Sequence, residues 1–194
     1  MADILQYNPR DFSSVTTEAA MGTDELALLR LHLHLENNAD NNTLLEQYRN
    51  AARESIEAAT DKVLLNETWE WAVDGEPPTD VIYLPKEPLS SITSVASYDT
   101  AGNATTFAAS NYTVDTKGNR FFLKEDGVWP SDLRNYRSLV ISYVAGYGTA
   151  ITDLPPLMRQ ALLLFVGHLW EFREEADMPK SVRRILAPLM SIEQ

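Results

Sequence analysis

The stretch YVAGYGTAITDLPPLMRQA, residues 143–161, contains the change from strand to helix that decides the fold. Its β-branched and aromatic start is typical of a strand, and its Pro-Pro pair is typical of a first helical turn. A phosphate-binding loop also places glycines here, but it needs a lysine, and none lies between Gly146 and Arg159. The carboxylate of Asp153 would repel an anion, and the dinucleotide fingerprint needs a third glycine in a βαβ setting. We therefore interpret the two glycines as a sharp corner in the chain.

The sequence after this corner predicts a long buried helix and then a short one. The long helix starts near residue 154 and is apolar around much of its circumference, which predicts the central helix of the fold. One face is formed by Leu157, Ala161, Leu164, His168 and Phe172, with Met158, Leu162, Phe165 and Leu169 beside it. Pro179 opens the short helix, whose apolar residues at helical spacing are Val182, Ile185, Leu186 and Leu189.

Two further helices are predicted near the N-terminus. The segment TDELALLRLHLHLEN, residues 23–37, has Thr23 as its expected N-cap and leucines on a widened stripe. A second helix is predicted from Thr43 to about Leu65, where Thr43 and Glu46 have the spacing of a capping box. Its alanines allow a neighbouring helix to approach closely.

Between these helices, residues 66–145 change to a period of about two, which predicts short strands. The expected strands are ETWEWAVDG, DVIYLP, SITSVASYDTAGNA, NYTVD, NRFFLK and RSLVISYVAGY. Turn residues at 99–103 and 117–119 predict hairpins, and hence a small antiparallel sheet or barrel.

These elements predict an α+β fold, in which a bundle of about four helices carries an inserted small antiparallel β subdomain. The expected parts are a flexible N-terminal arm (1–22), a helix pair (23–65), the β subdomain (66–148) and C-terminal helices with a docking tail (149–194).

The composition excludes several classes of function. The net charge is −12 over 194 residues, which disfavours binding to DNA or RNA. The chain has no cysteine, which excludes disulfides and thiolate metal sites. No apolar run is long enough for a membrane span, and the start MADILQYNPRDF is not a signal peptide. We therefore expect synthesis in the cytoplasm and no membrane partner.

No catalytic, metal or cofactor site is predicted. His32 and His34 point about 200° apart on a helix, so they cannot share a metal. His168 and Glu171 reverse the order of the carboxylate-bridged motif, which favours His168 as a core or interface residue. The many aromatic residues of the middle segment fit a carbohydrate or base-stacking platform, but a small sheet that needs a core explains them better.

One cationic segment, PKSVRRILAPLM (179–190), differs from the acidic remainder. Its cations suit the C-terminal end of a helix dipole, which is one interpretation. The other is a docking segment that offers a basic flank and an apolar stripe to another protein. The candidate partner-binding residues are Lys180, Arg183, Arg184, Leu186, Leu189 and Met190.

Several segments in order resemble the head–tail connector, or adaptor, proteins of tailed phages and gene-transfer particles. The matching segments, which together cover about residues 28–190, are LLRLHLHLENNADNNTLLEQYRNAARESIEAAT (28–60), NETWEWAVDG (66–75), IYLPKEPLSSITSVASYDTAGN (82–103), VWP (128–130), VISYVAGYG (140–148) and LPPLMRQALLLFVGHLWEFRE (154–174).

The resemblance implies a structural protein of the virion neck rather than an enzyme. Such proteins form a ring, usually of about twelve copies, below the portal. The ring extends the DNA channel and binds the stopper or tail, and C-terminal segments reach into the portal, which would be the role of Lys180 to Met190. A stopper or tail-completion protein is a close variant of this hypothesis. The alternative from another class is a small hydrolase or carbohydrate-binding domain that uses carboxylates and aromatics of the β subdomain.

Overall fold

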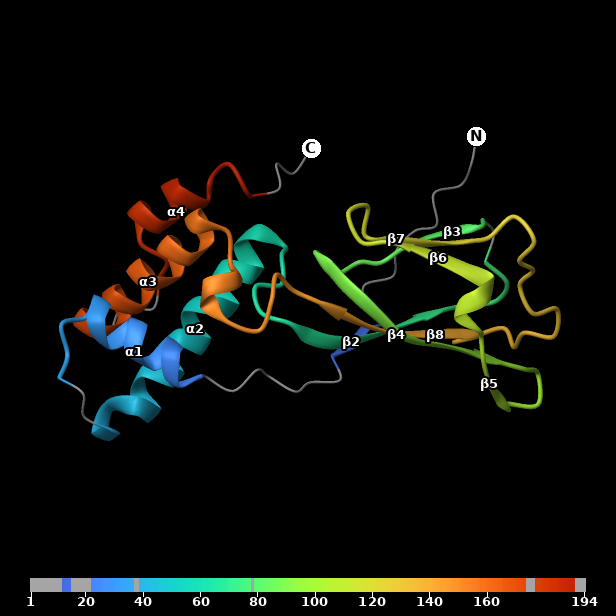
Figure 1. Ribbon diagram of the computed structural model, residues 1–194, viewed down its shortest axis with the longest axis horizontal. Coiled ribbons are helices and arrows are strands. Elements are labelled where there is room, and N and C mark those ends of the chain that lie inside the picture. The colour runs from blue at the N-terminus through green and yellow to red at the C-terminus, as the bar shows by residue number, and fades with distance from the viewer. Residues whose placement is uncertain (1–11, 15–21, 37–38, 78, 174–176, 191–194) are drawn as a thin grey trace. The chain divides into compact units, whose positions relative to one another are not determined.

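The structure is a computed structural model that describes residues 12–14, 22–36, 39–77, 79–173 and 177–190. They form an α+β fold of two compact units (Figure 1). The helical unit takes its described residues from 18–66 and 146–194, and the β unit takes its described residues from 1–17 and 67–145.

The helical unit is built around one central helix, as predicted. Its helices are α1 (Thr23–His32), α2 (Asn42–Thr60), α3 (Pro156–Glu171) and α4 (Lys180–Leu186), with short 3₁₀ turns η2 (Ala39–Asn41) and η4 (Ile151–Asp153). α3 packs against both α2 and α4, and the fully buried residues on it include Met158, Ala161, Leu162, Phe165 and Val166. The buried face is thus the one that contains Met158 and Phe165. The face that begins at Leu157 and ends at Phe172 is partly open, with these two residues 45% and 49% exposed.

The N-terminal helices differ from the prediction at their ends. α1 begins at Thr23 as its first helical residue, with Gly22 as the N-cap, and it ends at His32, five residues earlier than expected. His34 has φ 54°, which stops the helix, and Leu31 on the expected apolar stripe is 73% exposed.

The predicted capping box of the second helix is wrong. The N-cap is Asn41, whose backbone is already αR because η2 runs directly into α2, and Thr43 is the second helical residue. A capping side chain needs an extended N-cap backbone, so the preceding 3₁₀ turn removes the geometry for the box. α2 ends at Thr60, about five residues earlier than predicted, and its C-cap Asp61 has φ 53°.

The β unit contains two antiparallel sheets. The five-stranded sheet has the order β1 (Phe12–Ser14), β2 (Glu67–Val73), β8 (Leu139–Ala145), β4 (Leu89–Tyr98) and β5 (Ala104–Thr106). The three-stranded sheet has the order β3 (Val81–Tyr83), β7 (Arg120–Leu123) and β6 (Tyr112–Asp115). Every strand predicted from residues 66–145 is confirmed. β1 was not predicted, and it corrects the expectation that residues 12–14 belong to a flexible arm; the rest of 1–22, except Gly22, lies outside the described residues.

The two predicted hairpin turns are held by short side chains. In the β4–β5 turn, Asp99 Oδ1 accepts a hydrogen bond from the backbone N–H of Asn103 at 2.8 Å. The hydrogen bond that the Asn103 side-chain amide donates to Asp99 Oδ2, followed by this backbone hydrogen bond, holds the pKa of the Asp99 carboxyl below its usual value. In the β6–β7 turn, Asp115 Oδ1 accepts from the Gly118 N–H at 3.1 Å, and Asn119 takes φ 50°.

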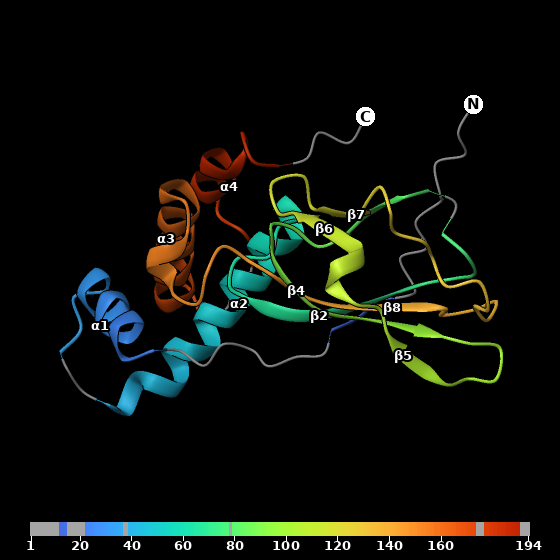
Figure 2. The ribbon, with the colours of Figure 1, turned by 45° about the vertical axis from the view of Figure 1, so that its right-hand side comes forward.

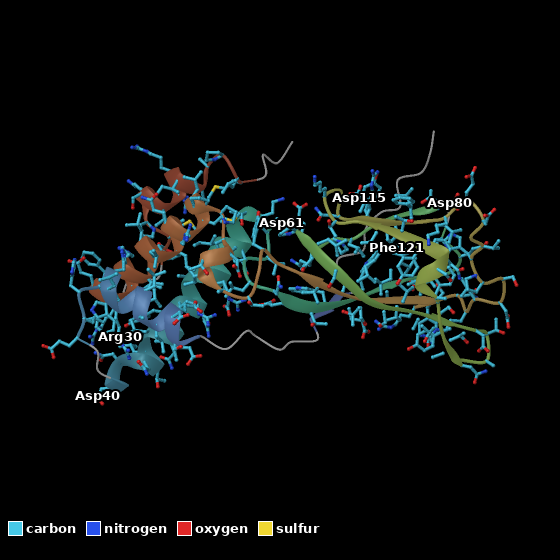
Figure 3. All side chains as sticks on the ribbon, in the orientation of Figure 1. Arg30, Asp40, Asp61, Asp80, Asp115 and Phe121 are labelled. Atoms are coloured by element: carbon cyan, nitrogen blue, oxygen red, sulfur yellow. The ribbon has the colours of Figure 1, made fainter. Side chains whose placement is uncertain are left out.

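Stacked rings form much of the core of the β unit. Phe107 lies between Tyr112 and Trp129, with ring centroids 6.1 and 5.3 Å away, and Phe121 contacts both of those rings edge-on. Phe121 is fully buried and points inward (Figure 3), and the other three rings are at most 8% exposed. The platform hypothesis is therefore wrong for the rings of Phe107, Phe121 and Trp129, because they are packed against each other.

Candidate assembly surfaces

The structure divides the predicted docking residues into a buried group and an exposed group. Leu186 is fully buried in the core of the helical unit together with Val182, and Leu189 and Met190 pack against that core. Lys180, Arg183 and Arg184 are exposed. The apolar stripe of α4 therefore contacts this chain's own α3, and the three cations are what the segment presents outward.

The charge of this exposed group is not balanced within its segment. Residues 178–190 contain three cations and no carboxylate. Two of the cations, Arg183 and Arg184, lie in the last turn of α4, where the helix dipole favours positive charge. We call Lys180, Arg183 and Arg184 the cationic face.

The charges exposed on the α1–α2 pair are mainly negative. Its arginines at 49 and 53 are only 2% and 3% exposed. Its exposed carboxylates are Asp24, Glu36, Asp40, Glu54 and Asp61. Asp40 and Asp61 lie near the two ends of α2 (Figure 3). The described part of this helix pair therefore presents a largely acidic surface.

A buried ion pair joins α1 to α2. Glu25 Oε1 lies 3.1 Å from Arg49 Nε, and the two side chains are 5% and 2% exposed. Burial raises the pKa of the Glu25 carboxyl, and the charge of Arg49 opposes this shift without cancelling it. Arg53 lies 3.7 Å from Glu57 Oε1, and that carboxylate also accepts the N–H of Leu64. These arginines are structural, because their charges are satisfied inside the unit.

A shallow groove lies where the ends of α1 and α3 meet. Its lining residues are His32, Leu33, Leu164, Gly167, His168, Trp170, Glu171 and Phe172. The ring of His168 lies 5.0 Å from that of Phe172, and the core or interface role of His168 stays a prediction. No group of three or more His, Asp or Glu side chains among the described residues is arranged to hold a metal ion.

The corner between strand and helix has a steric cause. Gly146 has φ 137°, and a Cβ there would lie 2.6 Å from the backbone of Leu65 and Asn66. The Gly148 carbonyl accepts the N–H of Asn66, and the Asp153 carboxylate accepts the N–H of Ala150. The loop thus bonds its polar groups to the backbone of the protein, in the loop itself and at Asn66, which agrees with the interpretation as a corner.

One partly exposed cluster of the β unit was missed by sequence reasoning. Arg134 lies over the ring of Tyr98 at 4.1 Å and over that of Tyr136 at 5.0 Å. Both Arg134 Nε and Nη2 donate to the carbonyl of Arg137. No sequence signal joins these residues, because Tyr98 and Arg134 come from different segments that only the sheet brings together.

Comparisons with known proteins relate this fold to virus-like particles. No family model matches the sequence, and no curated protein matches it significantly. A chain in the neck of an empty GTA particle, determined with C6 symmetry, superposes with a TM-score of 0.75 at 24% identity. A chain in the virion of a native gene transfer agent (GTA) particle gives 0.71 at 23%. A chain in the neck of a native GTA particle, determined with C12 symmetry, gives 0.71 at 25%.

Each of these superpositions covers 94% of this chain and 96% of the other chain. The protein therefore has the fold of chains found in the neck and virion of gene transfer agent particles. This confirms the resemblance to neck proteins that the sequence predicted. No helix among the described residues has the length and apolar character needed to cross a membrane.

Proposed function

We propose that this protein is a structural component of a virion neck, a head–tail connector that forms a ring below the portal. The observation that carries the proposal is the shared fold, which extends over nearly the whole of both chains in three GTA particle structures. The three matching chains are parts of assembled particles, which supports a structural role rather than an enzymatic one.

The ring is supported by the symmetry of the related particles. Two of the matching neck structures were determined with C6 and C12 symmetry. A closed ring of identical subunits needs two different surfaces on each subunit, one for each neighbour. The cationic face and the acidic α1–α2 surface are two such unlike surfaces. We propose twelve copies as the ring size.

The ring would extend the DNA channel and give the stopper or tail a binding surface. A net charge of −12 per chain would let DNA pass without adhering, because an acidic wall releases no counterions from the phosphate backbone. In this proposal the helical unit is a bundle into which the β unit is inserted as a subdomain. The C-terminal segment that carries the cationic face makes a protein contact within the neck.

Reconstitution with the portal tests the proposal directly. The full chain is mixed with the portal protein of the same particle and imaged by negative-stain electron microscopy. We expect rings on the portal and a mass increase that corresponds to a whole number of copies. A chain that stays monomeric and ignores the portal at high micromolar concentration would contradict the proposal.

The hydrolase or carbohydrate-binding alternative has no specific observation in its favour. Three of the aromatic rings that it needs at the surface, those of Phe107, Phe121 and Trp129, are instead buried in the core of the β unit. We therefore do not propose it.

A further inference from the structure

One side of α2 carries a stripe with the chemistry to receive the cationic face. The residues of α2 classed as exposed from its start are Thr43, Gln47, Ala51, Glu54 and Ala58. Steps of three and four residues place these positions on one side of the helix. We call this set the acidic stripe, because Glu54 is its one charged residue and Asp61 extends it at the C-cap.

The shape of the acidic stripe suits another helix. Ala51 and Ala58 lie on either side of Glu54 and project only a methyl group each. A neighbouring helix can therefore approach closely, with the Glu54 carboxylate between the two low positions. The nearby arginines, Arg49 and Arg53, are buried and turned into the unit, so no exposed cation of α2 competes for this carboxylate.

The cationic face and the acidic stripe lie on different sides of the same unit. α3 packs against α2 and against α4, and both views place α3 between α4 and the α1–α2 pair (Figures 1 and 2). The exposed charged residues of α4 are all cations, and the exposed charged residues of α2 and its C-cap, Glu54 and Asp61, are both carboxylates. Within the described helical unit, the two surfaces are therefore complementary in charge but cannot meet inside one copy.

We propose that the cationic face of one copy binds the acidic stripe of the next copy. This inference rests on the proposed ring, and it names the partner of the cationic face as a second copy of this chain rather than the portal. Two unlike, complementary surfaces on separate sides of a subunit join copies in one repeating direction, and such contacts close into a ring. Contact between two cationic faces or two acidic stripes is repelled, which fixes the direction of assembly.

Cysteine cross-linking tests the contact, because the chain has no cysteine of its own. Ala58→Cys places one thiol on the acidic stripe, and Ser181→Cys places one beside the cationic face without removing a charge; both positions are exposed. The two full-length variants are mixed in equal amounts, with and without the portal. The mixture is treated with a short bismaleimide and analysed by denaturing electrophoresis, and rings are scored in parallel by electron microscopy.

The expected result is a dimer band in the mixture and none with either variant alone, because the proposed contact joins unlike faces. Rings without the mixed cross-link would overturn this inference and leave the proposed function standing. A cross-link from Ser181→Cys to the portal would also overturn it and would assign the cationic face to the portal. Absence of rings with and without the portal would instead contradict the proposed function itself.

A charge swap provides a second, independent readout. Arg184→Glu should lower the yield of rings by about tenfold or more, because it places like charges opposite each other. Adding Glu54→Lys to the same chain should restore the yield, since the pair then has the opposite arrangement. Asp24→Lys, on α1 outside the stripe, is the matched control and should not rescue Arg184→Glu. If Asp24→Lys restores the yield of rings as well as Glu54→Lys does, the loss of rings depends on net charge alone, and the proposed contact is overturned.

Discussion

At the scale of single residues, Glu25 and Arg49 determine how α1 is attached to α2. Their side chains are almost completely buried, so each charge depends on the other for compensation. Sequence patterns could not reveal this pair, because Glu25 resembles an ordinary first-turn carboxylate and Arg49 an ordinary exposed cation. The two residues are 24 positions apart in the chain, and only the packing of α1 against α2 brings them together.

The pH dependence of stability should report on Glu25. Burial raises its pKa in the folded chain, so the folded state keeps this proton to a higher pH than the unfolded state does. The stabilisation is therefore complete below the unfolded pKa and is lost as pH rises through the folded pKa. Glu25→Gln cannot titrate, so the free energy of unfolding should shift in favour of the variant as pH rises from about 4 to about 8.

Urea unfolding of the two proteins across this pH range measures the difference. Glu54→Gln, which removes an exposed carboxylate from α2, is the matched control for loss of one negative charge. A Glu25→Gln difference that moves in favour of the wild type as pH rises would contradict the prediction.

Gly146 should tolerate no side chain. Gly146→Ala places a Cβ 2.6 Å from backbone atoms and forces an L-residue to φ 137°. We expect a loss of about 2–4 kcal/mol in the free energy of unfolding, since strain and overpacking each cost about 1–3 kcal/mol. Gly22→Ala has open space around its Cβ and should change stability by much less in the same urea titration. Equal losses in the two variants would show that the corner is not sterically constrained.

At the scale of the elements, the sequence predicted the type of nearly every helix and strand but not all of their ends. Periodicity located α3 and the strands β2 to β4 and β6 to β8, while β5 was not predicted as a separate strand. The capping box at Thr43 failed because a 3₁₀ turn, set by the preceding residues, changes the backbone of the N-cap. β1 escaped prediction because it lies in a polar segment without a regular period, and only its pairing with β2 defines it.

The candidate docking site was predicted in part. Sequence spacing located the apolar stripe of α4 and its cations. Spacing cannot distinguish a stripe that binds another protein from a stripe that packs in the core of its own chain. In the structure Val182 and Leu186 are fully buried against the rest of the helical unit. The complementary stripe on α2 needed the structure, because its residues show as exposed only once the buried side of the helix is known.

Removal of α4 should therefore damage the fold rather than a single surface. A chain that ends at Asp177 loses two fully buried side chains, each worth about 1.5–3 kcal/mol of burial. We expect a clearly lower midpoint in urea for this chain. The variant Arg183→Glu/Arg184→Glu should lower the free energy of unfolding by no more than about 1–2 kcal/mol, since both side chains are exposed and only their interaction with the helix dipole is reversed. A truncated chain with unchanged stability would mean that α4 does not belong to the core.

The cluster of aromatic side chains formed by Phe107, Tyr112, Phe121 and Trp129 should stabilise the β unit. Phe121→Ala removes a fully buried ring that contacts Tyr112 and Trp129 edge-on, and we expect a loss of about 3–5 kcal/mol. Tyr83→Ala, at a position 62% exposed on β3, is the control and should cost far less. Urea unfolding followed by tryptophan fluorescence measures both, and similar costs would place Phe121 outside the core.

At the scale of the whole molecule, charge separates this protein from those that grip nucleic acid. An excess of 12 negative charges opposes the phosphate backbone, although DNA would pass through the proposed ring. We expect no binding of a 30-base-pair fluorescent duplex, about 100 Å long, at about 50 mM salt in anisotropy measurements. Binding that weakens steeply as salt rises would reveal a cationic lumen and contradict the proposed acidic channel wall.

The position of β1 in the chain limits how the protein can be dissected. Its three residues precede the helices in the sequence but pair with β2 at the rim of the five-stranded sheet. A fragment of residues 67–145 would leave β2 as an exposed edge strand. The unpaired N–H and C=O groups of an edge strand can pair with strands of other molecules. A version of the β unit expressed alone should therefore include residues 12–14, joined to it through a linker. Without these residues, we expect the fragment to aggregate.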